Sequence, residues 1–376
     1  MTQPSIPMND LSRSVLEDRA AISTALERVV DSGWFIHGRE HEAFESEFAT
    51  FVGSTHCIGV ANGTDAIEVA LRTIGVKSGD KVCTIANAGF YSSTACLAID
   101  AIPVYVDVDP STLTMSPDAL RHALKIAPRA VIATHLYGGL GKIEEISTIC
   151  REAGVPLIED CAQATGAIAA SGARAGSIGD LGCFSFYPTK NLGAIGDGGA
   201  VVTSSDALAD RCRQVRQYGW STRYAVAEVG VNSRLDDLQA AVLRHRLTRL
   251  DERNQRRREI AATYQRALAD AGCAERLVFT NDPSHVAHLA VVVTDRRDVL
   301  RSALETQGVS CDVHYPISDD LQELWELPRR FLVSGNLEAT HHACESVLSI
   351  PCFPEMTDSE VALVGVALTN AVRSAE

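Results

Sequence analysis

The chain has 376 residues, of which 46% are hydrophobic and 22% charged, and its formal net charge is -14 at pH 7. These values are ordinary for a soluble enzyme, and the length allows one large core and a second lobe. The acidic balance argues against a nucleic-acid partner, because phosphates are bound by clustered Lys and Arg. The basic run at residues 253–258 continues a helical pattern, so a solvated helix face is favoured over a phosphate-binding patch.

The cysteines and the first residues indicate a reducing, cytoplasmic location. The 11 cysteines include no C-x-x-C pair, and the first ten residues are polar and carry prolines, unlike a signal peptide. We therefore expect free thiols and a cytoplasmic protein. No apolar run is long enough to cross a membrane. The histidines lack metal-ligand spacing, since His341 and His342 are adjacent on a predicted helix and point in different directions, so no metal is expected.

The first part of the chain alternates between helices and strands. The pattern predicts helices over residues 15–30, 64–74, 117–124 and 143–153, and strands over 57–60, 80–85, 102–106, 130–133, 155–158, 183–186 and 200–203. The strands are continuously apolar, which is typical of a mostly parallel sheet covered by helices on both faces. The fold class is therefore α/β.

The pattern changes after Asn232. Residues 235–271 are strongly helical and charged, and we expect this segment to link two lobes. A strand over 287–294, a helix over 299–307 and a strand over 309–314 predict a smaller α/β lobe. We divide the chain into a large cofactor-binding domain, 1–245, and a small C-terminal domain, 246–376.

Lys190 carries the strongest chemical signal. It follows an apolar strand that Pro188 ends, and it precedes a loop with glycines at 193, 196, 198 and 199. Desolvation in such a place disfavours the ammonium ion and makes a nucleophilic amine, which can bond covalently to an aldehyde cofactor. For an isolated lysine, a solvated loop residue would be the favoured interpretation. Lys190 gains weight from Ser185, Asp160 and the turn at Gly63.

The turn at Gly63 and Thr64 follows a strand and opens a helix. The free N–H groups and the dipole of a helix start favour a phosphate, and the Ser185 hydroxyl is a second candidate phosphate ligand. An ordinary helix cap is the better interpretation of the turn alone.

Asp160 comes at the end of a predicted strand, where ligands of open α/β sheets bind. A carboxylate there can keep a heterocyclic nitrogen protonated, although a helix-capping acid is an equally good interpretation of Asp160 alone. Gln163 follows closely and can hydrogen-bond the same cofactor or Asp160. Tyr91 follows another strand and can stack on a planar cofactor, although a core aromatic residue under a loop is common.

Several blocks in this order resemble the DegT/DnrJ/EryC1 family of nucleotide-sugar aminotransferases that depend on pyridoxal phosphate. The resemblance covers nearly the whole chain and rests on the following segments: Ala-Asn-Gly-Thr-Asp-Ala at 61–66, Pro-Val-Tyr-Val-Asp-Val-Asp at 103–109, Glu-Asp-Cys-Ala-Gln-Ala at 159–164, Gly-Asp-Leu-Gly-Cys-Phe-Ser-Phe-Tyr-Pro-Thr-Lys-Asn at 179–191 and Asn-Ser-Arg-Leu-Asp-Asp-Leu-Gln-Ala-Ala at 232–241. The lysine block is highly specific. The resemblance implies fold type I of pyridoxal-phosphate-dependent transferases, which is aspartate aminotransferase-like.

The resemblance also implies roles for the residues that contact the cofactor ring. Lys190 bonds to the cofactor and moves protons, Asp160 holds the pyridine nitrogen and Gln163 packs on the ring. Tyr91 stacks on the ring, or Phe90 does so if the alignment slips by one residue.

The resemblance further implies a homodimer with shared active sites. Gly63, Thr64 and Ser185 bind the cofactor phosphate, and Asn232 reaches the phosphate of the partner subunit's cofactor. The His314-Tyr315-Pro sequence lies near a nucleotide-linked keto sugar, and L-glutamate is the amino donor. Two segments depart from the family pattern: residues 86–89 and residues 317–320, both on the substrate side.

The block at 217–220 with 230–234 is similar to 3-aminotransferases that act on dTDP-3-keto-6-deoxyhexoses. A 4-keto sugar linked to UDP or GDP is the alternative substrate, and a pyridoxal-phosphate-binding regulator is the non-enzyme alternative. A dehydratase of the same family would carry histidine in place of Lys190. A nicotinamide enzyme is disfavoured, since the glycine loop lacks the G-x-G-x-x-G spacing.

Overall fold

The computed structural model describes residues 5–326 and 330–375. Its centre is an eight-stranded sheet in which β7 alone runs antiparallel to its neighbours. The strands, in spatial order, are β1 (His56–Val60), β7 (Gly199–Thr203), β6 (Leu181–Ser185), β5 (Leu157–Asp160), β4 (Ala130–Thr134), β2 (Lys81–Thr84), β3 (Ile102–Val106) and β12 (Leu332–Ser334). The predicted mostly parallel sheet is confirmed.

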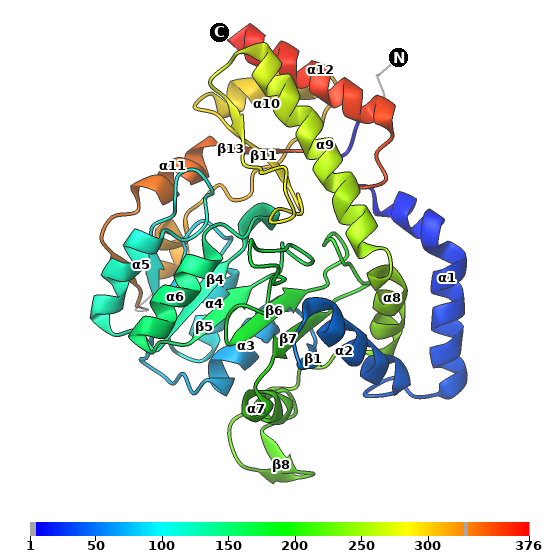
Figure 1. The fold of residues 1–376 in the computed structure, drawn as a ribbon, viewed down its shortest axis with the longest axis vertical. Helices are drawn as coiled ribbons and strands as arrows, with labels where there is room; N and C mark the ends of the chain where they lie inside the picture. The colour runs from blue at the N-terminus through cyan, green and yellow to red at the C-terminus, as the bar shows by residue number, and fades with distance from the viewer. Residues whose placement is uncertain (1–4, 327–329, 376) are drawn as a thin grey trace.

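Helices cover both faces of this sheet (Figure 1). Alternate residues of β4 point to opposite faces, so that Val131 belongs to one apolar core and Ile132 to the other. The first core is closed by α2 (Arg39–Val52), α5 (Pro117–Ala123), α6 (Ile143–Ala153) and α8 (Asp237–Leu247), and the second by α3 (Gly63–Thr73), α4 (Tyr91–Ala98) and α7 (Asp206–Arg216). Strands buried on both faces explain the continuous apolar runs in the sequence.

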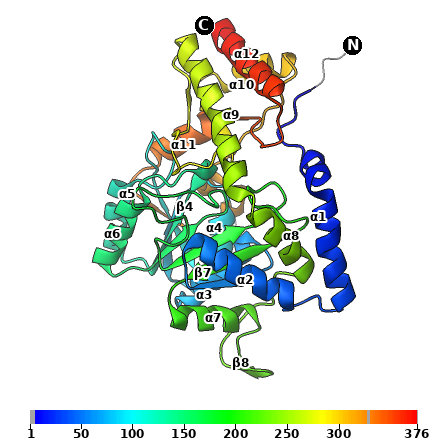
Figure 2. The same ribbon diagram turned by 45° about the vertical axis from the view of Figure 1, so that its right-hand side comes forward.

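A smaller lobe stands at one end of the large sheet (Figures 1 and 2). Its three-stranded antiparallel sheet has the order β10 (Arg276–Leu277), β11 (Ala290–Val293), β13 (Val347–Ile350). The helices that pack on it are α9 (Leu250–Ala271), α10 (Arg297–Thr306) and α12 (Asp358–Ala375), with α9 and α12 side by side. Residue Ile6 of the N-terminal segment joins this core before α1 (Leu11–Ser32) runs along α8.

The helical character of residues 235–271 is confirmed. The segment forms two helices, α8 and α9, because the chain turns at Thr248 and Arg249 without a proline or glycine to mark the break. One prediction about the second half of the chain is wrong. Residues 309–314 form no strand, because Val309 pairs with Ile6 while Asp312 pairs with Ser349. The first pairing is parallel and the second antiparallel, so the two do not form one continuous set of strand hydrogen bonds.

The chain also returns once to the large lobe: β12 pairs with β3, and α11 (Glu338–Ser346) follows before β13. Short 3-10 helices occur at Leu124–Ile126, Leu136–Gly138, Asp319–Leu321 and Glu323–Glu326, and a hairpin of β8 (Trp220–Thr222) and β9 (Ala225–Val226) follows α7. The domain boundary at 245/246 stays a prediction. Within the described ranges, the helices are too short or too polar to span a membrane.

Candidate active site

A cavity of about 1010 Å³ opens at the carboxyl ends of the parallel strands, where ligands of open α/β sheets bind. Thr134 ends β4, Asp160 ends β5 and Ser185 ends β6. The structure brings nine of the ten predicted site residues together around this cavity: Gly63, Thr64, Tyr91, Asp160, Gln163, Ser185, Lys190, His314 and Tyr315. Asn232 lies outside it.

Lys190 sits in a tight turn after β6, where its backbone N–H donates to the carbonyl of Tyr187 at 2.8 Å. Its side chain lines the cavity. Burial lowers the pKa of Lys190 to about 8, although the nearby Asp160 carboxylate acts in the opposite direction. At pH 7 roughly one amine in ten is therefore unprotonated and nucleophilic, far more than for a lysine of ordinary pKa.

Asp160 is a buried carboxylate that lines the same cavity as Lys190. Its Oδ1 accepts the N–H of Ala162 at 3.1 Å and its Oδ2 accepts the hydroxyl of Thr134 at 3.3 Å. Burial raises the pKa of Asp160, which the hydrogen bond from Ala162 and the charge of Lys190 partly offset. A cationic heterocyclic N–H group next to Asp160 would compensate the cost of burying the negative charge of its carboxylate.

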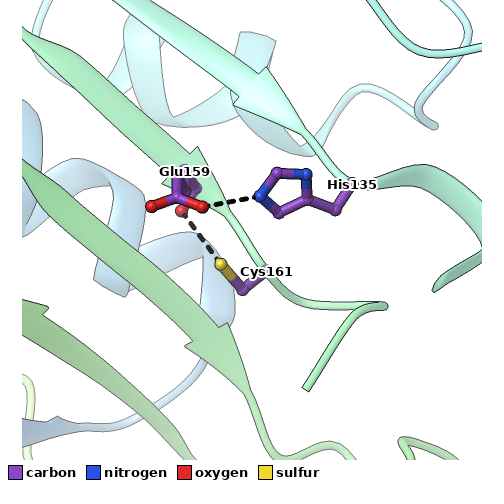
Figure 3. Close-up of side chains that lie close together, drawn as sticks. All are labelled: His135, Glu159 and Cys161. Atoms are coloured by element: carbon purple, nitrogen blue, oxygen red, sulfur yellow. Dashed lines mark hydrogen bonds and ion pairs between the residues drawn. The ribbon is translucent and has the colours of Figure 1, made fainter. Parts of the chain in front are cut away.

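A buried group of side chains supports the strand end that carries Asp160 (Figure 3). His135, Glu159 and Cys161 place ligand-type atoms within 4.8 Å of one another. The Glu159 carboxylate accepts His135 Nε2 at 2.9 Å and the backbone N–H groups of residues 176, 178 and 179 at 2.7 to 3.0 Å. Burial opposes its charge, yet these hydrogen bonds lower the pKa of Glu159. With its acceptor positions used in this way, the group acts as a structural support of β5.

The start of α3 forms a cradle beside Ser185. Asn62 caps the helix by accepting the N–H of Asp65 at 2.8 Å, while the N–H groups of Gly63 and Thr64 have no carbonyl one turn earlier in the helix. A Cβ at Gly63 would lie 2.7 Å from the Ser185 Cβ, so only glycine allows this approach. Two N–H groups and one hydroxyl therefore converge at a helix N-terminus, which favours an anion such as phosphate.

Aromatic and amide side chains form the wall between these groups. Gln163 is held at both ends: its Oε1 accepts the N–H of Tyr137 at 2.6 Å and its Nε2 donates to the Tyr315 hydroxyl at 3.2 Å. The Tyr91 ring lies edge-on to Tyr315, with their centroids 6.1 Å apart. Phe90 instead packs on Trp325 and is not part of the lining, so the geometry favours Tyr91 over the one-residue slip.

The small lobe contributes His314 to the cavity. Its Nδ1 lies 2.9 Å from the Ser349 hydroxyl, and its carbonyl accepts the Tyr137 hydroxyl at 2.5 Å. The contact with Ser349 lies within the small lobe, and the contact with Tyr137 holds the segment before Tyr315 against the large lobe.

Asn232 lies on the exposed surface, where its backbone pairs with Gln217 at the base of the β8–β9 hairpin. Sequence reasoning also missed other residues of the lining, among them Met8, Asn9 and His288. No local motif marks them, because the first two arrive through the pairing of Ile6 with Val309 and the third through the packing of the small lobe.

The chain matches the model of the DegT/DnrJ/EryC1/StrS aminotransferase family over residues 17–369. It is 39% identical, over 355 residues, to the dTDP-3-amino-3,4,6-trideoxy-alpha-D-glucose transaminase of Streptomyces venezuelae, covering 94% of this chain and 92% of the relative. It is 40% identical, over 368 residues, to the dTDP-3-amino-3,6-dideoxy-alpha-D-galactopyranose transaminase of Aneurinibacillus thermoaerophilus, covering 97% and 99%. The crystal structure of S. venezuelae DesV in complex with a ketimine intermediate superposes with a TM-score of 0.92 at 38% identity, covering 98% of each chain.

Fold and site together define a pyridoxal-phosphate-dependent aminotransferase of fold type I. The residues present fit that cofactor: a buried carboxylate for the ring nitrogen, a glycine cradle for the phosphate and an amine of lowered pKa. The chain belongs to the DegT/DnrJ/EryC1/StrS aminotransferase family.

Proposed function

We propose that this aminotransferase moves the amino group of L-glutamate to the keto carbon of a nucleotide-linked sugar, specifically a dTDP-3-keto-6-deoxyhexose. The observation that carries the proposal is Lys190, an amine of pKa about 8 that shares one cavity with the buried Asp160. The two curated relatives described above bear the names of dTDP-3-amino-sugar transaminases and align over nearly their full length, which supports the sugar and the nucleotide.

We assign the cofactor contacts from the same geometry. Asp160 would hold the ring nitrogen, while Gly63, Thr64 and Ser185 would bind the phosphate. Tyr91 and Gln163 would confine the ring. When bound, pyridoxal phosphate supplies an electron sink that stabilises negative charge at the carbon that loses its proton.

Lys190 is the residue that handles protons in this proposal. Its Nζ titrates near pH 8, so it can take a proton from carbon and return it elsewhere at little cost, as general acid–base catalysis requires. Asp160 remains ionised against a cationic ring nitrogen, because each charge compensates the burial of the other.

The walls of the cavity keep these charges out of bulk water. Gln163 and Tyr315 are joined by a hydrogen bond, and Tyr315 is held over the cavity by Tyr91 and by the small lobe. Exclusion of water strengthens the electrostatic interaction between Lys190 and Asp160.

We further propose a homodimer in which Asn232 reaches the partner subunit's site. Asn232 is exposed and its hairpin projects from the body of the molecule in both views (Figures 1 and 2). Large apolar side chains are exposed around it: Trp34 is 62% exposed, Tyr224 72% and Val229 74%. A neighbouring hollow is lined by Trp34, Trp220 and Tyr224 together with Arg213 and Arg234. Such an apolar surface with cationic groups suits burial against a second copy that carries a phosphate.

The experiment is a panel of 3-keto and 4-keto sugars linked to dTDP, UDP and GDP, each incubated with the loaded enzyme and L-glutamate. We expect an amino group at C3 of the dTDP-linked 6-deoxyhexose, identified by mass and NMR. Amination only at C4, or only of UDP- or GDP-linked sugars, would replace the proposed substrate. Turnover with L-alanine or L-aspartate but not L-glutamate would replace the donor.

A further inference from the structure

His288 is a histidine of the cavity that none of the sequence motifs includes. It precedes β11 in the small lobe, lines the same cavity as Lys190 and is only 7% exposed. The ring nitrogen of His288 that carries the proton can be assigned, because its hydrogen-bond partners lead to backbone carbonyls, which only accept hydrogen bonds.

Two backbone carbonyls determine the orientation of the amides that contact His288. Asn254 Nδ2 donates to the carbonyl of Thr165 at 2.9 Å, which leaves its Oδ1 as an acceptor. Asn191 Nδ2 then donates to Asn254 Oδ1 at 2.7 Å and to the carbonyl of Val286 at 3.1 Å. Because carbonyl oxygens only accept hydrogen bonds, neither amide can be flipped without losing these contacts.

These hydrogen bonds through Asn254 and Asn191 show which ring nitrogen of His288 carries the proton. The remaining amide atom, Asn191 Oδ1, lies 2.9 Å from His288 Nδ1 and can only accept. His288 Nδ1 must therefore carry the hydrogen, and in a neutral ring Nε2 then carries a lone pair.

The surroundings of His288 favour the neutral ring. Burial lowers the pKa of His288 well below its usual value, and the neighbouring charges of Lys190, Arg257 and His314 act in the same direction. The Arg257 guanidinium also donates to the His288 carbonyl at 3.2 Å. In the described part of the chain, no hydrogen bond is made by Nε2, although the residue is more than nine-tenths buried and faces the cavity. Nε2 therefore faces the cavity without a protein donor, and a ligand that supplies an O–H or N–H group can hydrogen-bond to it there.

We propose that His288 is a ligand-binding residue whose Nε2 accepts a hydrogen bond from an O–H or N–H group of the substrate beside Lys190. The inference rests on the proposed function, because it takes the substrates to be an amino donor and a hydroxylated sugar. The donor group comes either from the ammonium of glutamate or from a hydroxyl of the sugar, and both share the same chemistry toward Nε2.

The direct test is NMR of the enzyme labelled with ¹⁵N-histidine, with the resonances of His288 identified by their loss in His288→Gln. We expect the proton on Nδ1 between pH 6 and pH 8. Saturating L-glutamate or dTDP-glucose should shift the Nε2 resonance in the direction of a hydrogen-bonded nitrogen, and the ligand that does so identifies the source. A proton on Nε2, or an Nε2 resonance unchanged by both ligands, overturns the proposal.

A second test measures affinity in the cofactor-free enzyme, so that turnover plays no part. We expect His288→Phe to weaken binding of the shifting ligand by roughly two- to tenfold, which corresponds to one lost hydrogen bond, and His288→Gln to recover part of the loss through its carbonyl. His285→Phe is the matched control: His285 is similarly buried three residues earlier, lies edge-on to Phe279 and is not part of the lining. Equal weakening by both phenylalanine variants would show a purely structural effect and overturn the proposal. The keto-sugar panel judges the proposed function separately, since these readouts do not require transamination.

Discussion

At the scale of single residues, the chemistry depends on two charges placed in one poorly hydrated space. Burial lowers the pKa of Lys190 to about 8 and raises that of Asp160, and each group acts against the shift of the other. Asp160 ends β5 and Lys190 follows β6 in a tight turn, and these two strands are paired in the middle of the sheet. A reactive amine and its counter-charge are thus positioned before any ligand binds.

Replacing Lys190 by alanine should abolish transamination. The substitution removes both the nucleophile and the proton carrier, so we expect a loss of at least about two to four orders of magnitude in rate. Turnover and the visible absorbance of bound cofactor measure the two roles. Lys190→Arg keeps the charge without the nucleophile and should be equally inactive. Near-normal turnover of either variant would exclude Lys190 as the catalytic lysine.

Replacing Asp160 by asparagine should leave the fold intact and slow the first half-reaction. The carboxylate is expected to make a charge-assisted hydrogen bond to the ring nitrogen, and an amide supplies one roughly half as strong. Single-turnover absorbance with L-glutamate measures the step, while circular dichroism controls for folding. An unchanged half-reaction would contradict the assignment of Asp160.

At the scale of elements, the two segments that depart from the family pattern contact each other. Asp319 donates its backbone N–H to the carbonyl of Ala86 at 2.7 Å. Its carboxylate accepts the N–H of Phe90 at 3.0 Å and the hydroxyl of Ser93 at 2.7 Å. It therefore caps α4, which begins at Tyr91 without a cap from its own sequence. A residue more than 200 positions away thus orients the aromatic wall of the cavity.

Replacing Asp319 by alanine should destabilise the protein by about 1–3 kcal/mol and move Tyr91. Two hydrogen bonds to a buried carboxyl group are lost, although the burial that raises the pKa of Asp319 to about 7 offsets part of their benefit. Denaturant unfolding measures the free energy of unfolding, and a higher KM for the keto sugar would show that Tyr91 has moved. Asp319→Asn keeps an acceptor for the N–H of Phe90, so its free energy of unfolding should lie between those of the unmodified protein and Asp319→Ala. A loss no larger than that of the exposed Asp298→Ala would contradict the capping role.

The ion pair of Glu45 in α2 makes the stability of the protein depend on pH. Its Oε1 accepts Arg216 Nη1 at 2.6 Å, His41 Nε2 lies 2.8 Å away, and the N–H of Gly59 also donates to it. Burial opposes the charge, but these partners lower the pKa of Glu45 to about 2.

The folded pKa of Glu45 lies below the unfolded value, so its contribution to stability is present above about pH 4.5 and is lost as the pH falls toward 2. The shift corresponds to about 3 kcal/mol at neutral pH. We expect Glu45→Gln to lower the free energy of unfolding at pH 7 by up to this amount, and the difference from the unmodified protein to shrink between pH 5 and pH 2. Urea unfolding across that range is the measurement, and a difference that does not depend on pH would contradict the assignment.

At the scale of the whole molecule, one subunit does not bring all the predicted site residues together. Asn232 lies on the exposed face beside the hairpin, among apolar side chains such as Trp34 and Tyr224. A second copy over this face would bury them and bring Asn232 toward the other cavity.

Mixing two inactive variants tests the shared site. If Asn232 acts in the partner's site, heterodimers of Lys190→Ala and Asn232→Asp hold both lesions in one site and leave the other intact. Random pairing should then restore about one active site in four, measured as turnover after subunit exchange. If each subunit builds its own site, every site keeps one lesion and no activity returns. That result, or a fully active monomer, would exclude the shared active site.

The sequence by itself determined the α/β class, the succession of the main strands along the chain and the candidate residues for cofactor chemistry. It could do so because buried parallel strands are continuously apolar and because local pattern reveals the strand end at Asp160, the helix start at Gly63 and the loop after a strand that carries Lys190. The family resemblance added roles that no local pattern contains.

Only the tertiary structure decided which distant segments complete the cavity. His288 and the cap formed by Asp319 depend on contacts between residues roughly 100 to 230 positions apart, whose side chains obey no local periodicity. The failed strand at 309–314 has the same cause. A segment becomes a strand only where a neighbouring backbone continues alongside it, and here Ile6 and Ser349 each pair with a single residue of the segment.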